Sequence, residues 1–243
     1  MSAKTDIAWT DSSWNPVSGC THAGSPGCDH CYARAIAMRF QGDFIVRCHK
    51  DRLEIPLHWK KPRRIFLCST GDLFHEAVSF EFIHQVMLRI RDCEHHTFQI
   101  LTKRPERMVD FFKWAQSWRS IYYGAGWTNL WLGTTVETQA QDWRINELLK
   151  CPAARYFISH EPAIGPLVLP PEFLALDKRA WVIIGAESGP GRRPFSIPDA
   201  KALVAQCREA GVKVFVKQIN IVGKVSRDMS QWPEDLRVRE FPV

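Results

Sequence analysis

Short apolar runs alternate with longer segments of helical spacing over most of this 243-residue chain. The runs are nearly continuous in apolar and β-branched side chains, which is typical of strands buried on both faces of a parallel sheet. Because strand and helix alternate, successive strands are expected to be joined by right-handed helical crossovers. The expected strands are Ile65–Ser69, Thr97–Leu101, Leu130–Thr135, Arg155–Ser159, Trp181–Gly185 and Val212–Val216.

Upstream of these runs, Trp14–Ser18 is expected to form a first strand and Cys28–Phe40 a first helix. The chain then contains roughly six or seven βα units, which favours an α/β fold with a partial, open parallel β/α barrel over a closed eight-fold one. A doubly wound sheet is the alternative. We expect a single domain over residues 1–243, with a polar, basic tail from about residue 222. The later helices are expected at Phe80–Arg91, Pro105–Trp118, Thr138–Lys150 and Pro198–Ala210.

The chain has no apolar run near the roughly 20 residues that a membrane span needs, and its first residues lack a secretory signal. We therefore expect a cytoplasmic protein with no membrane partner. The formal net charge of +6 favours acidic partners. The charge alone does not distinguish nucleic acid from a phosphorylated small molecule, because both fit it equally well. Basic residues concentrate at 60–64 and at Arg192-Arg193.

Polar residues follow nearly every expected strand. In parallel βα folds, ligands bind at the carboxyl ends of the strands, where the connecting loops meet. Helix caps and solvated loops explain some of these residues, but not the pairing of carboxylates with cations beside apolar strands. We therefore predict a polar site at this rim. Its candidate residues are Gly71, Asp72, Lys103, Arg104, Glu137, Glu161, Glu187, Ser188, Gly189 and Lys217.

Three of the eight cysteines are clustered, with the spacing C-x7-C-x2-C, between the expected first strand and first helix. Thiolates favour zinc or an iron–sulfur cluster over harder cations. Zinc would need a fourth ligand, for which His22, His30 and His49 are candidates. Spacing alone leaves the two metals undecided. The clustered residues are Cys20, Cys28 and Cys31; the scattered Cys48, Cys68, Cys93, Cys151 and Cys207 are expected to be small buried side chains.

A three-cysteine loop after the first strand of a partial barrel resembles the radical S-adenosylmethionine superfamily, whose usual spacing is C-x3-C-x2-C. The stretches "IAWTDSSWNPVSGC", "GCDHCYA", "TGDLFHE", "LTKRPERM", "LWLGTTVETQ", "SHEPAIGPL", "WVIIGAESGPGRRP" and "VFVKQ" resemble the bacteriophage three-cysteine-motif family, long described as a domain of unknown function. That family is in turn similar to spore photoproduct lyase.

The resemblance implies a [4Fe–4S] cluster on Cys20, Cys28 and Cys31, with S-adenosylmethionine on the remaining iron and a 5′-deoxyadenosyl radical as the reactive species. It also implies an electron donor such as flavodoxin or ferredoxin and a location in the cytoplasm of a bacterial host, and it leaves open whether a companion protein is needed. For the substrate we expect a modified thymidine base in phage DNA, with isomerisation of an amino-acid-modified thymine as one concrete reaction. Repair of a thymine photolesion is the alternative.

Positions along the expected strands suggest roles for the rim residues. Gly71 and Asp72 are expected at the methionyl amino group of the cofactor. Lys103, Arg104 and Lys217 suit its carboxylate or a substrate phosphate, with Glu161 as a further candidate for catalysis. Glu137 and the turn Glu187–Gly189 are expected at the ribose and adenine. A different class of function also stays open: a zinc-stabilised nucleic-acid-binding protein that uses Trp9 and Trp14 for stacking.

Overall fold

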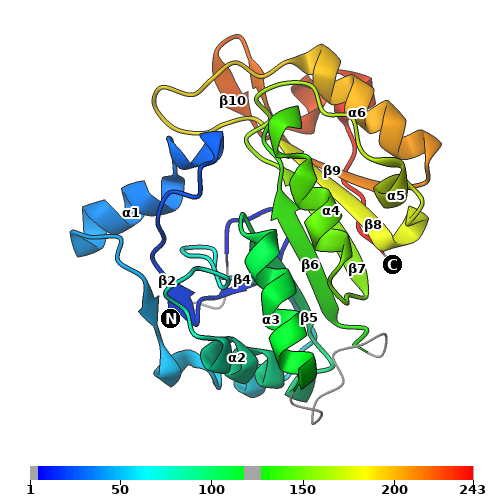
Figure 1. Ribbon diagram of the computed structural model, residues 1–243. Helices are drawn as coiled ribbons and strands as arrows, with labels where there is room; N and C mark the ends of the chain where they lie inside the picture. Colours follow the sequence, from blue (N-terminus) through cyan, green and yellow to red (C-terminus); the bar gives the residue numbers. More distant parts are fainter. Residues whose placement is uncertain (1–4, 118–126, 243) are drawn as a thin grey trace.

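Eight strands form one curved sheet in a computed structural model that describes residues 5–117 and 127–242. Every neighbouring pair is parallel except the last, and the spatial order of these strands follows their order along the chain. The first and last strands are not paired with each other within the described residues, so the barrel is open (Figure 1). The expected partial parallel β/α barrel is confirmed. The strands are β1 (Ser12–Trp14), β4 (Arg64–Leu67), β5 (Thr97–Thr102), β6 (Leu130–Thr135), β7 (Arg155–His160), β8 (Ala180–Gly185), β9 (Lys213–Ile221) and β10 (Lys224–Ser226).

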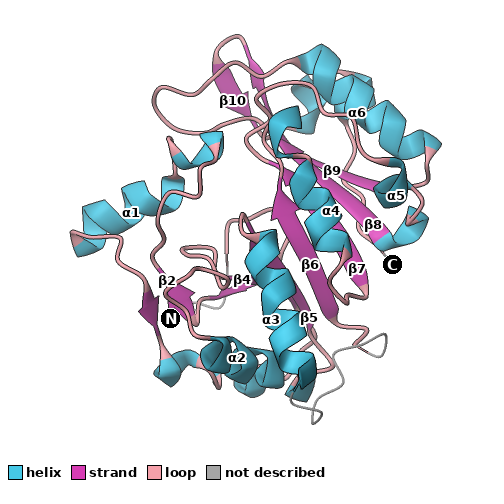
Figure 2. Ribbon diagram, viewed as in Figure 1, coloured by secondary structure: helices cyan, strands magenta, loops and turns pink. Residues whose placement is uncertain are grey.

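Four helices that follow strands cover the outer face of the sheet (Figures 1 and 2). Two of them begin with a side-chain cap, because Ser79 and Ser196 each accept a hydrogen bond from a backbone N–H in the first turn of the helix they precede. Helix α1 differs, since it stands away from the curved sheet in Figure 1. The helices are α1 (Tyr32–Gln41), α2 (Phe80–Asp92), α3 (Pro105–Ser117), α4 (Trp143–Leu149), the short α5 (Pro171–Leu174) and α6 (Ile197–Glu209).

The expected first strand, Trp14–Ser18, is split in the structure. Only β1 belongs to the main sheet, while β2 (Val17–Ser18) pairs with β3 (Arg47–Cys48) in a separate two-stranded sheet. Pro16 lies between them and has no N–H to donate, which suits the break. The first helix also begins later than expected, at Tyr32.

One other helix prediction needs correction, and the end of another is not tested. The expected Thr138–Lys150 helix is a 3-10 turn followed by the shorter α4. Helix α3 is described to Ser117, and Trp118, its expected last residue, lies outside the described residues.

The inner face of the sheet is aromatic near the amino ends of the strands and polar near their carboxyl ends. Side chains alternate between the two faces of a strand, so β4, β6, β7, β8 and β9 each contribute one aromatic residue inward, and polar residues that line a cavity follow it on β6, β7 and β9. On β9, for example, Phe215 belongs to the inner cluster and Lys217 lines a cavity. The aromatic layer closes the amino end of the barrel. Its aromatic members are Trp9, Phe66, Trp131, Phe157, Trp181 and Phe215, and Ile183 packs with them.

Gly133 makes room for this inner layer. A Cβ at this position would lie 2.5 Å from the ring of Phe157, which is fully buried. We expect Gly133→Ala to lower the free energy of unfolding by about 1–3 kcal/mol, because a packed core accommodates extra volume only by straining its neighbours. Chemical denaturation measures the change. Gly165→Ala is the matched control, since a Cβ there meets nothing within 4 Å, and an equal loss in both variants would contradict the prediction.

The segment after residue 222, expected to be a polar tail, partly packs on the sheet. β10 extends the sheet, and the side chains of Trp232, Leu236 and Val238 are buried.

The basic run at 60–64 leads into β4, at the end of the barrel opposite the carboxyl ends of the strands. There Arg63 donates to Ser12 and Arg64 pairs with Asp11. No helix among the described residues is long and apolar enough to span a membrane. The single-domain organisation stays a prediction.

Candidate active site

A cavity of about 940 Å³ opens at the carboxyl ends of the parallel strands. Trp9, Phe66 and Leu101 contribute apolar lining, which continues the aromatic layer of the barrel. Polar residues from the ends of β5 to β9 line it as well. The three clustered cysteines line the same cavity, so the structure brings the cysteine motif and the predicted rim together. The rim residues among its lining are Gly71, Asp72, Lys103, Arg104, Glu161, Glu187, Ser188 and Lys217.

The cysteines lie on a segment that we call the cysteine loop, residues 19–31. The loop starts in direct backbone contact with the end of β4, because Gly19 N–H donates to the Thr70 carbonyl at 2.9 Å. A Cβ on Gly71 would approach backbone atoms of residues 17–19 to about 3.0 Å. Gly71 therefore allows the close approach of two chain segments, and its expected contact with a cofactor amino group stays a prediction.

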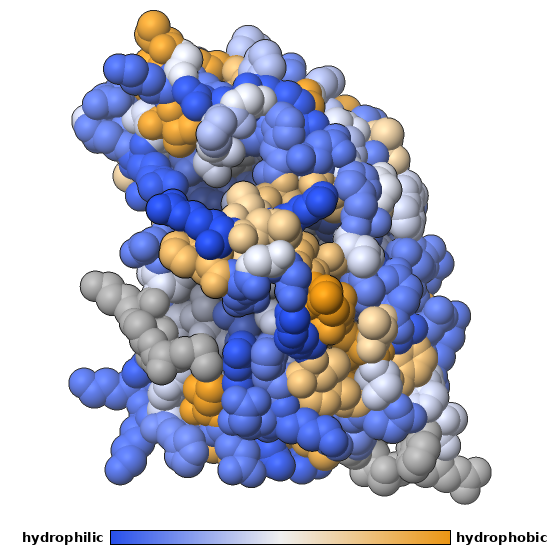
Figure 3. All heavy atoms as spheres, turned by 90° about the vertical axis from the view of Figure 1, so that its left-hand side faces the viewer, coloured by the Kyte–Doolittle hydropathy of each residue, from blue (hydrophilic) through white to orange (hydrophobic). Residues whose placement is uncertain are grey.

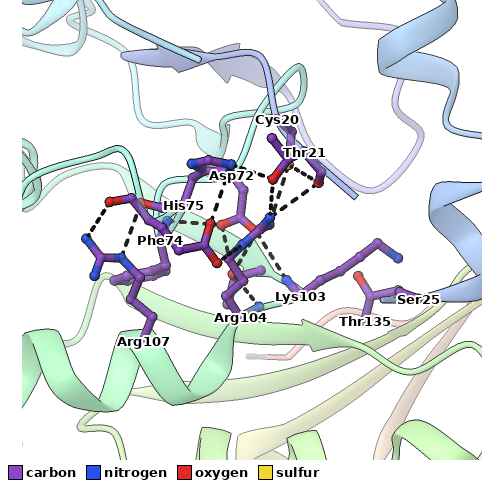
Figure 4. A network of polar contacts seen from close by, with 12 residues as sticks. Cys20, Thr21, Ser25, Asp72, Phe74, His75, Lys103, Arg104, Arg107 and Thr135 are labelled. Carbon is purple, nitrogen blue, oxygen red and sulfur yellow. Dashed lines mark hydrogen bonds and ion pairs between the residues drawn. The ribbon is translucent and has the colours of Figure 1, made fainter. Parts of the chain in front are cut away.

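The first anchor of the cysteine loop is the buried guanidinium of Arg104 (Figure 4). It lies 3.1 Å from Asp72 Oδ2 and donates to the carboxylate of Glu76. Its remaining N–H groups reach the cysteine loop, at Cys20 Sγ (3.4 Å) and at the carbonyl and hydroxyl of Thr21. Arg104 thus ties the start of the loop to the ends of β4 and β5.

Asp72 is occupied by this same anchor. Its carboxylate also accepts hydrogen bonds from the Thr102 hydroxyl and from the backbone N–H of Phe74. A role at the methionyl amino group would require sharing or displacing one of these donors. Burial and the nearby Asp72 carboxylate raise the pKa of the Cys20 thiol to about 11, against the opposing effect of Arg104.

The second anchor centres on Glu137, whose side chain is fully buried at the end of β6. It accepts a hydrogen bond from the Ser25 hydroxyl in the cysteine loop at 2.5 Å and forms ion pairs with Lys103 and Arg144. Burial raises the pKa of Glu137, but Lys103, Ser25 and Arg144 outweigh it, so the pKa lies below its usual value. Gly27 packs against this carboxylate, since a Cβ would lie 2.6 Å from Glu137 Oε1.

The third anchor joins the end of the cysteine loop to the loop after β8. Glu187 pairs with Arg193 and lies 3.1 Å from His30 Nδ1, and Arg193 also donates to the Pro26 carbonyl. Burial opposes ionisation of Glu187, yet hydrogen bonds from Arg193 and His30 lower its pKa. Glu137 and Glu187, expected at the ribose and adenine, are therefore engaged in holding the loop. The neighbouring Ser188 is exposed and lines the cavity, whereas Gly189 is exposed and is not among the lining residues.

Glu161 and Lys217 form an ion pair that faces the cavity, and within the described part of the chain neither side chain is hydrogen-bonded to the cysteine loop. The Lys217 ammonium lies 3.2 Å from Glu161 Oε1, and both side chains remain partly exposed. The Glu161 carboxylate packs against Gly185, where a Cβ would approach it to 2.3 Å. This pair places a donor and an acceptor side by side for a bound molecule.

The three thiols suit an iron–sulfur cluster better than a structural zinc ion. Within residues 5–117 and 127–242, no group of three or more His, Cys, Asp or Glu side chains, the three cysteines included, is drawn together around a metal position. The histidines considered for zinc have other partners: His22 binds Asp29, His30 binds Glu187 and His49 binds Ser18. Three cysteines on the wall of a cavity offer soft ligands and leave room for a second molecule.

Two predictions about individual residues are wrong. Trp9 and Trp14 are buried, with 2% and 1% of their surface exposed, so neither ring is available to stack on nucleic acid. Both belong to apolar clusters instead. Cys48 is exposed, whereas the other four scattered cysteines are buried as expected.

Several site residues carry little signal in the sequence. Ser25 and Thr21 are small polar residues in a loop, and Arg193 reads as part of a basic run. Arg144 does have a sequence signal, because its spacing of four residues from Leu148 places it on the buried face of α4. A charged residue in this core-facing register indicates a buried ion pair.

Comparisons with known proteins support the fold. No curated protein matches the sequence. A cysteine-to-serine mutant of spore photoproduct lyase is similar in structure, with a TM-score of 0.53, 10% identity, and coverage of 89% of this chain and 79% of that chain. Spore photoproduct lyase complexed with dinucleoside spore photoproduct gives a TM-score of 0.51 at 11% identity, covering 88% and 79%. The family model described as "Protein of unknown function (DUF5131)" matches residues 4–235, and the chain therefore belongs to this family.

Proposed function

We propose that this protein is a radical S-adenosylmethionine enzyme that acts on a thymine-derived base in DNA. The observation that carries the proposal is the position of Cys20, Cys28 and Cys31 on the wall of one large cavity at the carboxyl ends of a partial barrel. The likeness in fold to spore photoproduct lyase supports the same assignment.

A [4Fe–4S] cluster held by these three cysteines, together with S-adenosylmethionine, would supply one-electron cleavage of the sulfonium and abstraction of hydrogen from the substrate. The protein's own residues orient and protect the reactants. The three anchors hold the cysteine loop against β4, β6 and the loop after β8. The apolar residues Trp9, Phe66 and Leu101 limit water at the base of the cavity.

The charges that line the cavity fit a polar substrate and the cofactor's amino-acid group. Lys103 and Lys217 suit a carboxylate or a phosphate, and Glu161 suits an ammonium or an N–H donor. A thymine that carries an amino acid presents both kinds of group. We therefore propose isomerisation of an amino-acid-modified thymine in phage DNA as the reaction, with flavodoxin or ferredoxin as the class of electron donor.

Repair of a thymine photolesion is the second candidate. It is supported by the similar structure that is complexed with dinucleoside spore photoproduct. The cavity volume and the position of the cysteines suit either base, so the two candidates differ in substrate and share the proposed chemistry.

The test uses anaerobically reconstituted protein, a strong reductant and S-adenosylmethionine, with hypermodified or UV-irradiated DNA as substrate. We expect release of 5′-deoxyadenosine and a changed nucleoside, detected by mass spectrometry after digestion. Change in the modified DNA supports the isomerase, and change in the irradiated DNA supports the lyase. If the nucleosides of both samples stay unchanged and no 5′-deoxyadenosine appears, the proposed function is wrong.

Two variants on β9 test whether Lys217 takes part in the reaction. Lys217→Met is expected to lower product formation about tenfold or more, because a charge-assisted hydrogen bond in the cavity is lost, while the iron content stays at the wild-type level. Lys213→Met is the matched control, since Lys213 lies near the start of β9, at the other end of the barrel, and pairs with Glu240. Equal activity of the two variants would remove Lys217 from the site.

A further inference from the structure

Large exposed apolar side chains cluster on α1 and the loop that follows it. Among the described residues nine large hydrophobic side chains are exposed, and five of them fall between residues 32 and 45. Phe40 is 74% exposed and Ile45 62%. Scattered exposed hydrophobics are normal, but a cluster of this kind marks a surface that another molecule covers. The five are Tyr32, Ile36, Met38, Phe40 and Ile45.

The geometry of α1 explains why these side chains are exposed, although the Tyr32 hydroxyl donates a hydrogen bond to the Ser69 carbonyl at 2.7 Å. Only Ala33 and Ala37 are buried on this helix. Tyr32, Ile36 and Phe40 are spaced four residues apart, so they form a row along one side. Figure 3 views the side of the molecule that carries α1 and shows apolar atoms in the middle of this face, with strongly hydrophilic groups around them.

Helix α1 carries positive charge, and Asp43, the acidic residue of the loop between α1 and Ile45, is paired with Arg47. Helix α1 contains Arg34 and Arg39 and no carboxylate, and the Arg39 guanidinium lies 5.3 Å from the centre of the Phe40 ring. Lys224 and Arg227 lie near the end of β9, in the part of the chain that forms the other side of the cavity mouth, and Arg227 lines the cavity. Such a mixture of arginines and an aromatic ring suits phosphates and bases.

The surface is also continuous with the cavity. Tyr32, Ile36 and Met38 line the cavity while remaining about half exposed. A molecule that covers α1 therefore also lies over the cavity mouth. A protein bound there would obstruct a polymeric substrate, whereas a DNA duplex bound there would deliver one.

We propose that α1 and Ile45 form a contact surface for duplex DNA, on which Phe40 stacks in the space left by a base turned into the cavity and Arg34 and Arg39 contact phosphates. This inference rests on the proposed function, since a base must leave the stack to reach a buried site. Apolar side chains that enter the base stack are a known means of stabilising opened DNA.

The test measures binding of a fluorescein-labelled duplex with one thymine–thymine mismatch to the reconstituted protein, by fluorescence polarisation. We expect Phe40→Ala to weaken binding about tenfold, because stacking of one base on an aromatic ring is lost. Phe40→Trp is expected to keep wild-type affinity. Val168→Ala is the matched control, since Val168 is 63% exposed and is not among the residues that line the cavity.

Two further readouts separate stacking from charge. A 2-aminopurine placed beside the mismatch should brighten on binding of the wild type and less with Phe40→Ala, because the fluorophore reports unstacking. Arg39→Gln should reduce the slope of log affinity against log salt by about 1.

Equal affinity of Phe40→Ala and Val168→Ala would overturn the proposal and point to an acidic protein as the occupant. Absence of DNA binding by the wild type would overturn it as well. Both outcomes concern binding alone. They are thus distinct from failure to release 5′-deoxyadenosine, which tests the proposed function.

Discussion

Replacing Arg104 by alanine is expected to lower the free energy of unfolding by about 3–5 kcal/mol, the usual cost of removing one partner from a buried ion pair. The guanidinium is 4% exposed and contacts Asp72, Glu76, Cys20 and Thr21. Alanine leaves a cavity and removes every one of these contacts. Because two of them belong to the cysteine loop, the same change should also lower the iron bound after anaerobic reconstitution.

Chemical denaturation and iron analysis measure the two effects. Arg91→Ala is the matched control, because its ion pair with Asp92 is exposed and is expected to contribute at most about 1 kcal/mol. Arg104→Lys should retain part of the stability, since an ammonium reaches one partner but cannot reproduce the fork of a guanidinium. Equal losses for Arg104→Ala and Arg91→Ala would show that Arg104 does not anchor the loop.

Much of the fold was predictable because the strands are buried on both faces. β6 was expected at Leu130–Thr135, and the structure has the same bounds. The continuous apolar pattern of such strands leaves few alternatives, and alternation with helices then requires parallel pairing. The first strand was harder to predict, because the break at Pro16 divides it between two sheets.

The place of the candidate site was predictable for a related reason. Parallel strands bring their carboxyl ends to one edge, so residues that follow β5, β6 and β8 had to lie close together. Their partners were not predictable, because the pairs span long separations in sequence. Ser25 meets Glu137 across 112 residues, and Arg193 reaches Pro26 across 167. No local spacing records such contacts, so rim carboxylates that looked free for a cofactor turn out to hold the cysteine loop.

The surface of α1 illustrates a different limit. Its apolar residues predicted a helix correctly, but the pattern could not show that the helix would leave most of them exposed. The two residues it buries, Ala33 and Ala37, are both small, so the helix covers little apolar surface of its own. An apolar pattern indicates that a helix face is buried in a contact. It does not show whether the contacting residues belong to the same chain or to another molecule.

Replacing Cys28 by alanine is expected to reduce both the visible absorption of the reconstituted protein and the release of 5′-deoxyadenosine by about a hundredfold or more. Even residues that only support a metal ligand contribute about 10–100-fold, so loss of a ligand should cost at least as much. Cys20→Ala and Cys31→Ala should behave alike, because three thiolates are needed to hold the cluster.

Cys48→Ala is the matched control for these variants, since Cys48 is a free, exposed thiol that is not among the residues lining the cavity. It should keep its iron, colour and activity. Absorption spectra, iron and sulfide analysis, and zinc analysis are made on the same samples. A colourless wild type with one zinc per chain would indicate a structural metal, because a closed zinc site needs a fourth protein ligand and leaves no position for a sulfonium. Retention of colour and activity in Cys28→Ala would mean that the cluster is held elsewhere, and the assignment of the cysteine loop would be wrong.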